Sequence, residues 1–542
     1  MAVVAVLSRT HTTTDRNGTG NETSQSFADC WRWWLIPAAI AFVLALLFAD
    51  PFIGDWDGLD YTVASLRGSP SSMALGRSVF IYFNHALWLL AHNLFNLRPE
   101  NAYLLFKYAV VAQSPLVVVA CWILGRDVTR SLYAATIAAS LVALSPPFII
   151  YSGQVMTETQ SLLLLALALV IHLRGLRERK AWMVILGAAL LGLGVNVRET
   201  VGFYGVWLII GPIACGWKMR RREITTLALS CVAFFIFALG IFVALFYWDV
   251  HSFRASWLGW LEASQAESAL HPVRVRNLIP FLLFFFLDAP LLFLALPFSL
   301  VREWREHRFS PLLALACTGL FADALLLFNY STTVNWRYFL TGLPALAPIT
   351  ATFLMKAFAS RTRTINQAFA CVALLIVSFA ILFGLIFKPV SRKYRQERAE
   401  TKNYIERLSG LPRDAVMISG SQTVAVNYWR ALGAGEWDTI GTGSGWPGST
   451  ISSVIEKFLR ENRRVFLDED PRWWPPCGWQ RAEIYNLASI EQRFHFRRVS
   501  ENIYEIRPVE DEAAHDAPQL QKLLPENRPE ETSGCPRLGK IS

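Results

Sequence analysis

The chain has 542 residues, of which 53% are hydrophobic and only 17% are charged, and its mean hydropathy of +0.34 is too high for an ordinary soluble enzyme of this size. Its 51 Lys and Arg against 42 Asp and Glu give a formal charge of +9, which in a soluble protein would indicate a nucleic-acid partner. Low charge, aperiodic Gly and Pro, and eight scattered cysteines without a CxxC pair exclude a disordered chain, a collagen and a disulfide or zinc scaffold. We therefore expect a membrane protein.

The hydropathy pattern predicts a polytopic α-helical protein with about 11 transmembrane helices between residues 34 and 388. Apolar runs of about 17 to 25 residues are long enough to cross a bilayer. The first 33 residues are polar, and the first run lacks a small-residue cleavage site, so we expect an uncleaved anchor behind an N-terminal segment 1–33. The eleven candidate spans are 34–50, 103–124, 131–149, 158–173, 182–196, 201–217, 225–248, 278–300, 311–329, 338–355 and 366–388.

The short loops between these spans differ sharply in positive charge. One alternating set carries 16 Lys and Arg, whereas the other short loops contribute only Arg198 and Arg337. Lys and Arg near span ends are retained on the cytoplasmic side, so the N-terminus is expected inside and segments 51–100 and 249–277 outside. The basic charge thus reflects orientation in the plasma (inner) membrane and requires no nucleic-acid partner.

The segment 389–508 has a different character from the spans before it. Charged residues alternate with short strand-like runs at 415–419 and 464–467, and an amphipathic stretch at 451–460 predicts a helix between them. We expect a small external (periplasmic) α/β domain. The tail 509–542 is rich in Pro and charged residues, which indicates a disordered end.

The first outer loop, 51–100, contains three carboxylates within six residues: Asp55, Asp57 and Asp60. Residues 57, 60, 61 and 64 have helical spacing, so Asp57, Asp60 and Tyr61 would share one face of a short interfacial helix. A carboxylate held there could deprotonate a hydroxyl or an amine. The alternative is a solvated helix cap, in which Asp55 or Asp57 accepts backbone N–H bonds.

Other charged residues near the outer ends of spans are candidates for substrate binding. Arg337 could hold a phosphate through two hydrogen bonds, or it could be an arginine that extends to the membrane surface. Glu158 begins a span, where it could orient a substrate or simply complement the helix dipole. Arg198 and Glu199 could form a local ion pair or contribute to the same pocket. Asp288 before Ala-Pro predicts a helix break, and Asp323 is expected to pair with another span.

Three stretches in matching order resemble the GT-C glycosyltransferase superfamily, and within it the protein O-mannosyltransferase and aminoarabinose transferase group. They are the first outer loop, with Asp57 four residues before Tyr61; SPP at 145–147 followed by MTET at 156–159; and NWRYFLTGLPALAP at 335–348. Together they cover most of residues 50–360. The resemblance implies an enzyme that passes a sugar from a polyprenyl-phosphate donor to a lipid, glycan or protein acceptor at the outer face of the membrane.

The resemblance also implies residue roles. Asp57 would be the general base, but relatives carry an Asp-Glu pair where this chain has Asp-Gly, so Asp60 or Asp55 would supply the second carboxylate. Tyr61, Glu158, Arg198, Glu199, Arg337 and Tyr338 would bind substrate, and His271 lies in a loop that would close over it. No metal-ligand set is predicted, and the sequence leaves a divalent metal open without requiring one.

Two other classes of protein fit a polytopic chain. A flippase or transporter of lipid-linked sugars would show inverted repeats and broken midplane helices, which are not evident in the sequence. A surface-glycan polymerase or ligase would carry one very large outer loop between late spans, whereas here the large outer segments are the first loop and the C-terminal region.

Overall fold

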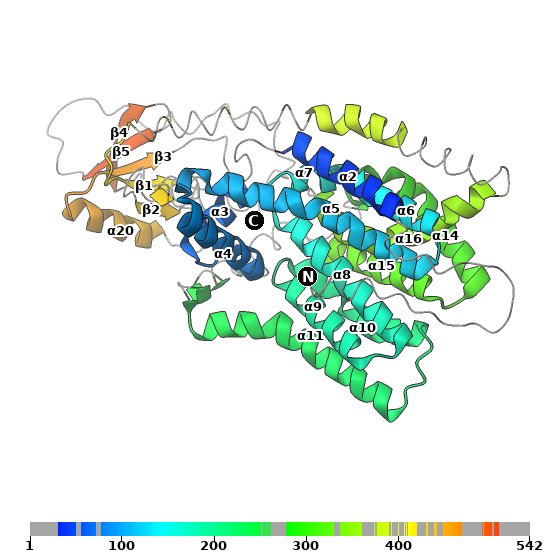
Figure 1. Cartoon of the computed structure of the whole chain (residues 1–542). Coiled ribbons are helices and arrows are strands. Elements are labelled where there is room, and N and C mark those ends of the chain that lie inside the picture. Colours follow the sequence, from blue (N-terminus) through cyan, green and yellow to red (C-terminus); the bar gives the residue numbers. More distant parts are fainter. Residues whose placement is uncertain are drawn as a thin grey trace, which may run out of the picture. The chain divides into compact units, whose positions relative to one another are not determined.

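The computed structural model describes residues 31–49, 56–71, 77–250, 278–329, 336–359, 377–389, 410–419, 438–441, 448–468, 493–500 and 503–508, with a few residues between these ranges. The chain divides into two compact units. Figure 1 labels their helices and strands. We call them the helical unit (1–51, 104–244 and 273–393) and the mixed unit (52–103, 245–272 and 394–542).

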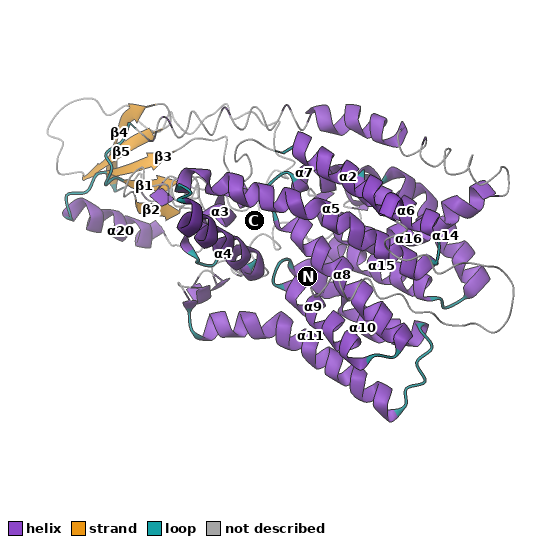
Figure 2. Ribbon diagram, in the orientation of Figure 1, coloured by secondary structure: helices purple, strands orange, loops and turns teal. Residues whose placement is uncertain are grey.

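The described residues of the helical unit lie mainly in apolar helices (Figure 2). Helix α2 packs against α6, α8 against α9, and α16 against α6 and α14. Proline at the first position begins three helices, as expected where an N–H has no helical acceptor. The helices are α2 (Trp31–Leu47), α5 (Ala102–Thr129), α6 (Leu132–Ala143), α7 (Pro146–Ser152), α8 (Thr157–Glu178), α9 (Ala181–Val195), α10 (Trp207–Ala214), α11 (Arg221–Tyr247), α13 (Leu278–Asp288), α14 (Pro290–His307), α15 (Pro311–Asn329) and α16 (Leu343–Ala359). Two 3₁₀ segments, η2 (Glu199–Val206) and η5 (Trp336–Thr341), and a π-helical turn, η6 (Phe383–Phe387), complete the list.

Helices occupy every predicted span from 34 to 355, but not all as single straight rods. The predicted span 131–149 is wrong as a continuous helix, because α6 and α7 are bent by 63° where Pro146 and Pro147 follow Ser145. The predicted break at Asp288 is confirmed, since α13 ends there and α14 begins at Pro290. In the described part, the helices long and apolar enough to cross a membrane alone are 99–129, 157–178 and 221–247. The total of eleven spans stays a prediction.

Helix α9 approaches α11 closely at Gly192. A Cβ at this glycine would lie 2.4 Å from the main-chain oxygen of Phe234, so no larger residue fits without a shift. At the end of α9, the Asn196 side chain donates to the main-chain oxygen of Phe237 at 2.6 Å. These contacts fix the turn that leads directly into η2.

The mixed unit contains helices α3 (Trp56–Arg67) and α4 (Ser78–Phe95), the 3₁₀ turn η1 (Pro99–Asn101), and a five-stranded sheet. The strands are β1 (Val416–Ser419), β2 (Asp438–Gly441), β3 (Val465–Asp468), β4 (Phe494–Ser500) and β5 (Ile503–Pro508), in the order β2-β1-β3-β5-β4. Strands β2, β1 and β3 are parallel, and β5 joins β3 antiparallel. The amphipathic helix α20 (Gly448–Arg460) contributes Ile451 and Ile455 to the core of the sheet. The predicted strands and the helix between them are confirmed, whereas the boundaries 389–508 and 509–542 stay predictions.

Candidate active site

The first outer loop forms the predicted helix, α3, and its acidic residues are buried. Asp57 is 7% exposed, Asp60 9% and Tyr61 1%. Asp57 lies in the first turn, where a negative charge complements the helix dipole. Asp57 is therefore not solvated, although its place in the first turn is one that also suits a capping carboxylate. Two carboxyl groups withdrawn from solvent on one short helix are a costly arrangement that needs positively charged or hydrogen-bonding partners.

Arg77 is a positively charged neighbour of this helix that the sequence analysis did not identify. Its side chain is buried, and its Nε donates to the hydroxyl of Tyr61 at 2.9 Å. The Tyr61 ring packs edge-on against Phe80 of α4, with ring centroids 5.7 Å apart. Arg77 immediately precedes α4 and follows a Gly- and Ser-rich stretch. In the sequence, Arg77 differs from its neighbours only as a lone arginine at the start of an apolar helix.

The end of α3 is fixed by a second set of contacts. Gly68 follows the helix with a φ of +63°, the left-handed conformation that favours glycine. His85 Nδ1 hydrogen-bonds the main-chain oxygen of Ser65 at 2.7 Å. Burial lowers the pKa of the Arg67 guanidinium, and Arg430 lowers it further, while Asp60 opposes them. Asp60 therefore interacts electrostatically with a positive charge on its own helix.

In the helical unit, Glu158 and Arg198 form a deeply buried ion pair. Glu158 lies in the first turn of α8, and Arg198 immediately precedes η2; their side chains are 2% and 3% exposed. The Nε of Arg337, in η5, lies 3.5 Å from Glu158 Oε1, and its side chain is 12% exposed. Such burial contradicts the alternative of an arginine that keeps its guanidinium in water at the membrane surface. Arg198 pairs with Glu158 from another helix, which favours the pocket over a purely local pair with Glu199.

Aromatic rings surround the two arginines of this cluster. The guanidinium carbons of Arg198 and Arg337 lie 4.9 and 5.6 Å from the ring centroid of Tyr338, and Arg337 also lies 5.8 Å from the ring of Tyr151. These are cation–π distances, and they restrict the orientation of both side chains. Tyr151, at the end of α7, is a second residue that the sequence analysis missed. We refer to Tyr151, Glu158, Arg198, Arg337 and Tyr338 as the arginine cluster.

The predicted site residues thus fall into two groups. Asp57, Asp60 and Tyr61 come together on α3, and Glu158, Arg198, Arg337 and Tyr338 come together in the arginine cluster. Glu199 begins η2, with a side chain that is neither fully buried nor fully exposed. Asp55 and His271 lie outside the described residues.

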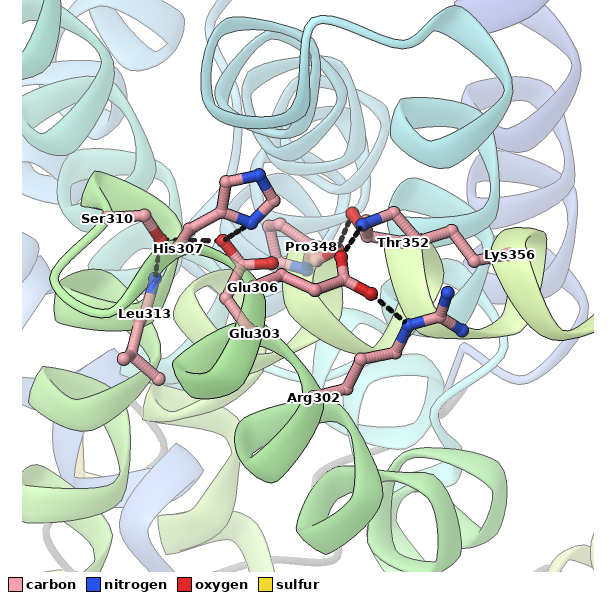
Figure 3. Close-up of polar contacts among 9 residues, drawn as sticks. All are labelled: Arg302, Glu303, Glu306, His307, Ser310, Leu313, Pro348, Thr352 and Lys356. Atoms are coloured by element: carbon pink, nitrogen blue, oxygen red, sulfur yellow. Dashed lines mark hydrogen bonds and ion pairs between the residues drawn. The ribbon is translucent and has the colours of Figure 1, made fainter.

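One group of side chains in the described part could geometrically hold a metal ion, at the end of α14. Glu303, Glu306 and His307 bring one ligand atom each within 4.8 Å of one another. Figure 3 shows that these carboxylates already have partners. Arg302 Nε and Lys356 Nζ reach Glu306 at 2.6 and 2.5 Å, and the hydroxyl of Ser310 donates to Glu303 at 2.7 Å. We interpret the group as an ion-pair network that links α14 to α16.

Apolar helices of membrane-spanning length, one bent helix pair and a buried charged cluster define the class as a polytopic helical membrane protein. No family model matches the chain, and no curated protein sequence matches it. Among solved structures, the chain resembles ArnT from Cupriavidus metallidurans bound to undecaprenyl phosphate, with a TM-score of 0.57 and 12% identity over 88% of this chain and 98% of that one. The chain therefore shares the fold of that structure, which is the GT-C fold that the sequence resemblance implies.

Two further structures are of oligosaccharyltransferases from Archaeoglobus fulgidus, one of them named AglB. The complex with an inhibitory peptide and a dolichol-phosphate gives a TM-score of 0.49 and 13% identity over 89% of this chain and 74% of that chain. The apo form gives 0.43 and 13% over 81% and 69%.

Proposed function

We propose that the protein is a membrane glycosyltransferase that moves a sugar from a polyprenyl-phosphate-linked donor to a lipid, glycan or protein acceptor. The observation that carries this proposal is the arginine cluster. It brings two guanidinium groups together around one carboxylate in an apolar helical unit. Charges this deep are costly unless they serve a ligand or partner, and planar guanidinium groups suit a phosphate.

The GT-C fold supports a lipid-linked donor. ArnT, whose structure resembles this chain, was solved with undecaprenyl phosphate. In the proposed reaction, Arg198 and Arg337 hold the donor phosphate, Tyr338 orients both guanidinium groups, and Glu158 keeps them in place. Tyr61, Glu199 and His271 are proposed to contact substrate.

Asp57 is proposed as the general base, with Asp60 or Asp55 as the second carboxylate. The Asp57 carboxylate takes the proton from the acceptor hydroxyl or amine, and the acceptor oxygen or nitrogen forms a bond to the anomeric carbon of the sugar. The bond between that carbon and the phosphate oxygen breaks, and its electron pair leaves with the polyprenyl phosphate. The arginines stabilise the negative charge that develops on this phosphate.

The charge of the loops supports an orientation for this reaction. We propose that the N-terminus lies in the cytoplasm and that the acidic helix α3 and the C-terminal sheet face the outside of the plasma (inner) membrane. Nucleotide sugars are cytoplasmic, whereas a lipid-linked donor can present its sugar at the outer face. A donor of this kind is therefore consistent with external catalysis.

The test compares membrane glycolipids and glycoproteins by mass spectrometry in cells with and without the gene. Deletion should remove one sugar mass, and the wild-type gene should restore it. Asp57→Asn should lower transfer roughly 10²- to 10⁴-fold at unchanged protein level, as expected for a general base. Glu100→Gln, an exposed carboxylate in the same loop, is the matched control and should restore the sugar. Full restoration by Asp57→Asn would exclude the assignment of the base.

The 63° bend between α6 and α7 favours one second candidate, a flippase of lipid-linked sugars, because broken helices are typical of transporters. Purified protein in lipid vesicles distinguishes the two functions. Movement of a lipid-linked sugar across the bilayer without covalent transfer would support the flippase and contradict the transferase.

A further inference from the structure

Two segments that are remote in sequence carry the two arginines of the arginine cluster, and they contact each other through hydroxyl groups. Arg198 immediately precedes η2, and Arg337 is the second residue of η5. Tyr204 in η2 donates its hydroxyl hydrogen to the main-chain oxygen of Thr341, the last residue of η5, at 2.8 Å. The hydroxyl oxygens of Thr200 and Thr341 lie 3.2 Å apart. These side chains are at most 3% exposed.

Gly342, which joins η5 to α16, is confined from the other side by Asp323 of α15. A Cβ at Gly342 would lie 2.2 Å from Asp323 Oδ2, so a larger residue there would force the carboxyl group of Asp323 to shift. Within the part of the chain that the structure describes, neither oxygen of Asp323 has a hydrogen-bond partner. Tyr204 and Asp323 therefore hold the Thr341–Gly342 junction from two helices.

We propose that Tyr204 is a positioning residue, with Thr341, Gly342 and Asp323, that sets the spacing of the two arginines for the donor phosphate. The reason is geometric. Arg198 and Arg337 both interact with Glu158 and both lie on the ring of Tyr338, so a shift of η5 along η2 would separate the guanidinium groups. Two closely spaced guanidinium groups bind one phosphate better than two that diverge. This inference rests on the proposed function for its ligand.

The first test uses Tyr204→Phe, which removes the hydroxyl and keeps the ring. We expect the affinity of the detergent-solubilised protein for undecaprenyl phosphate to fall about two- to tenfold, the effect of one buried hydrogen bond. Amide hydrogen exchange in residues 336–341 should rise at the same time. Tyr133→Phe, a partly exposed phenol on α6, is the control and should change neither quantity.

The second test introduces a steric conflict between residue 342 and the carboxyl group of Asp323, and then removes that carboxyl group. Gly342→Ala should weaken undecaprenyl phosphate binding more than Tyr204→Phe does, and the double variant Gly342→Ala/Asp323→Ala should recover part of the loss. Gly240→Ala is the matched control, because an added Cβ on α11 would meet its nearest neighbour at an ordinary 4.0 Å. A merely destabilising substitution would lower the unfolding temperature without this recovery of binding.

The outcomes separate the two proposals. If Tyr204→Phe leaves both exchange in 336–341 and lipid affinity unchanged, the positioning role is wrong. If exchange rises as expected but the wild-type protein does not bind undecaprenyl phosphate, the proposed donor is wrong and the coupling of η2 to η5 stands. If Tyr204→Phe weakens binding with no change in exchange, the hydroxyl acts on the ligand directly, and the positioning role is likewise overturned.

Discussion

The carboxylate of Glu158 and the guanidinium of Arg198, 40 positions apart in the sequence, form an ion pair whose two side chains are at most 3% exposed. Removal of one member of such a pair lowers the free energy of unfolding strongly, because the other member is left as an uncompensated buried charge. We therefore expect Glu158→Gln to destabilise the protein by about 3 to 5 kcal/mol. The double variant Glu158→Gln/Arg198→Met should lose less than the single variant. Unfolding temperatures in detergent measure both, and a double variant that loses as much as Glu158→Gln or more would contradict this expectation.

The contact between Arg77 and Tyr61 predicts a smaller effect in the mixed unit. Tyr61→Phe removes the acceptor of the Arg77 Nε–H while it keeps the ring against Phe80, so we expect a loss of about 1 kcal/mol in unfolding free energy. Arg77→Gln should cost more, because it also removes a buried positive charge that contacts the acidic helix α3. Denaturation of the full-length protein measures both losses of unfolding free energy. A larger loss in Tyr61→Phe than in Arg77→Gln would contradict the prediction.

Two glycines with positive φ allow a matched comparison. Gly68→Ala would place a Cβ 2.7 Å from His85 Nε2, and the ring cannot easily move because its Nδ1 is bonded to Ser65. Gly216→Ala, at a φ of +70°, would meet nothing within 4 Å and should cost only about 1 to 2 kcal/mol for the left-handed backbone. We expect the larger loss at Gly68, measured as unfolding temperature. His85→Ala should reduce that difference by removing the conflict.

The ion pairs of Glu306 predict a pH dependence. Hydrogen bonds from Lys356 and Arg302 lower the pKa of Glu306 from 4.5 to about 2. A lowered pKa in the folded state means that the carboxylate stabilises the protein above pH 4.5, and that this contribution is lost as the pH falls towards 2. Glu306→Gln should therefore lower the unfolding temperature slightly at neutral pH, and the difference from the wild type should shrink below pH 4.5. A difference that persists unchanged at pH 2 would contradict the assignment.

The helices and the acidic loop could be predicted because their signals are local. Apolar runs and helical spacing lie within a few neighbouring residues, so α3 and the spans up to 355 follow from the sequence alone. Glu158, Arg198 and Arg337 could be identified as candidates from their positions at span ends, but not as partners, since their pairing is set by helix packing. Arg77 and Tyr151 were missed for the same reason: each becomes informative only through a tertiary contact.

Buried hydroxyl groups were the least predictable part of the site. Tyr204, Thr200 and Thr341 lie among apolar residues and leave no trace in hydropathy or charge, although they join the two segments that carry the arginines. Gly342 gives no signal of its tertiary contact either, since glycine between two helical segments has many causes. What favours glycine there is one carboxyl group from another helix, 19 positions earlier in the chain.

The bend between α6 and α7 also affects how the apolar content of this chain should be understood. All seven residues of α7 are buried, including Phe148, Ile149 and Ile150. These three side chains are apolar, yet they pack against protein. The same short helix supplies Tyr151 to the arginine cluster. The three apolar side chains keep water away from the arginine cluster. Polar substitutions in α7 should therefore change the interactions among Glu158, Arg198 and Arg337, and should have less effect on the insertion of the protein into the bilayer.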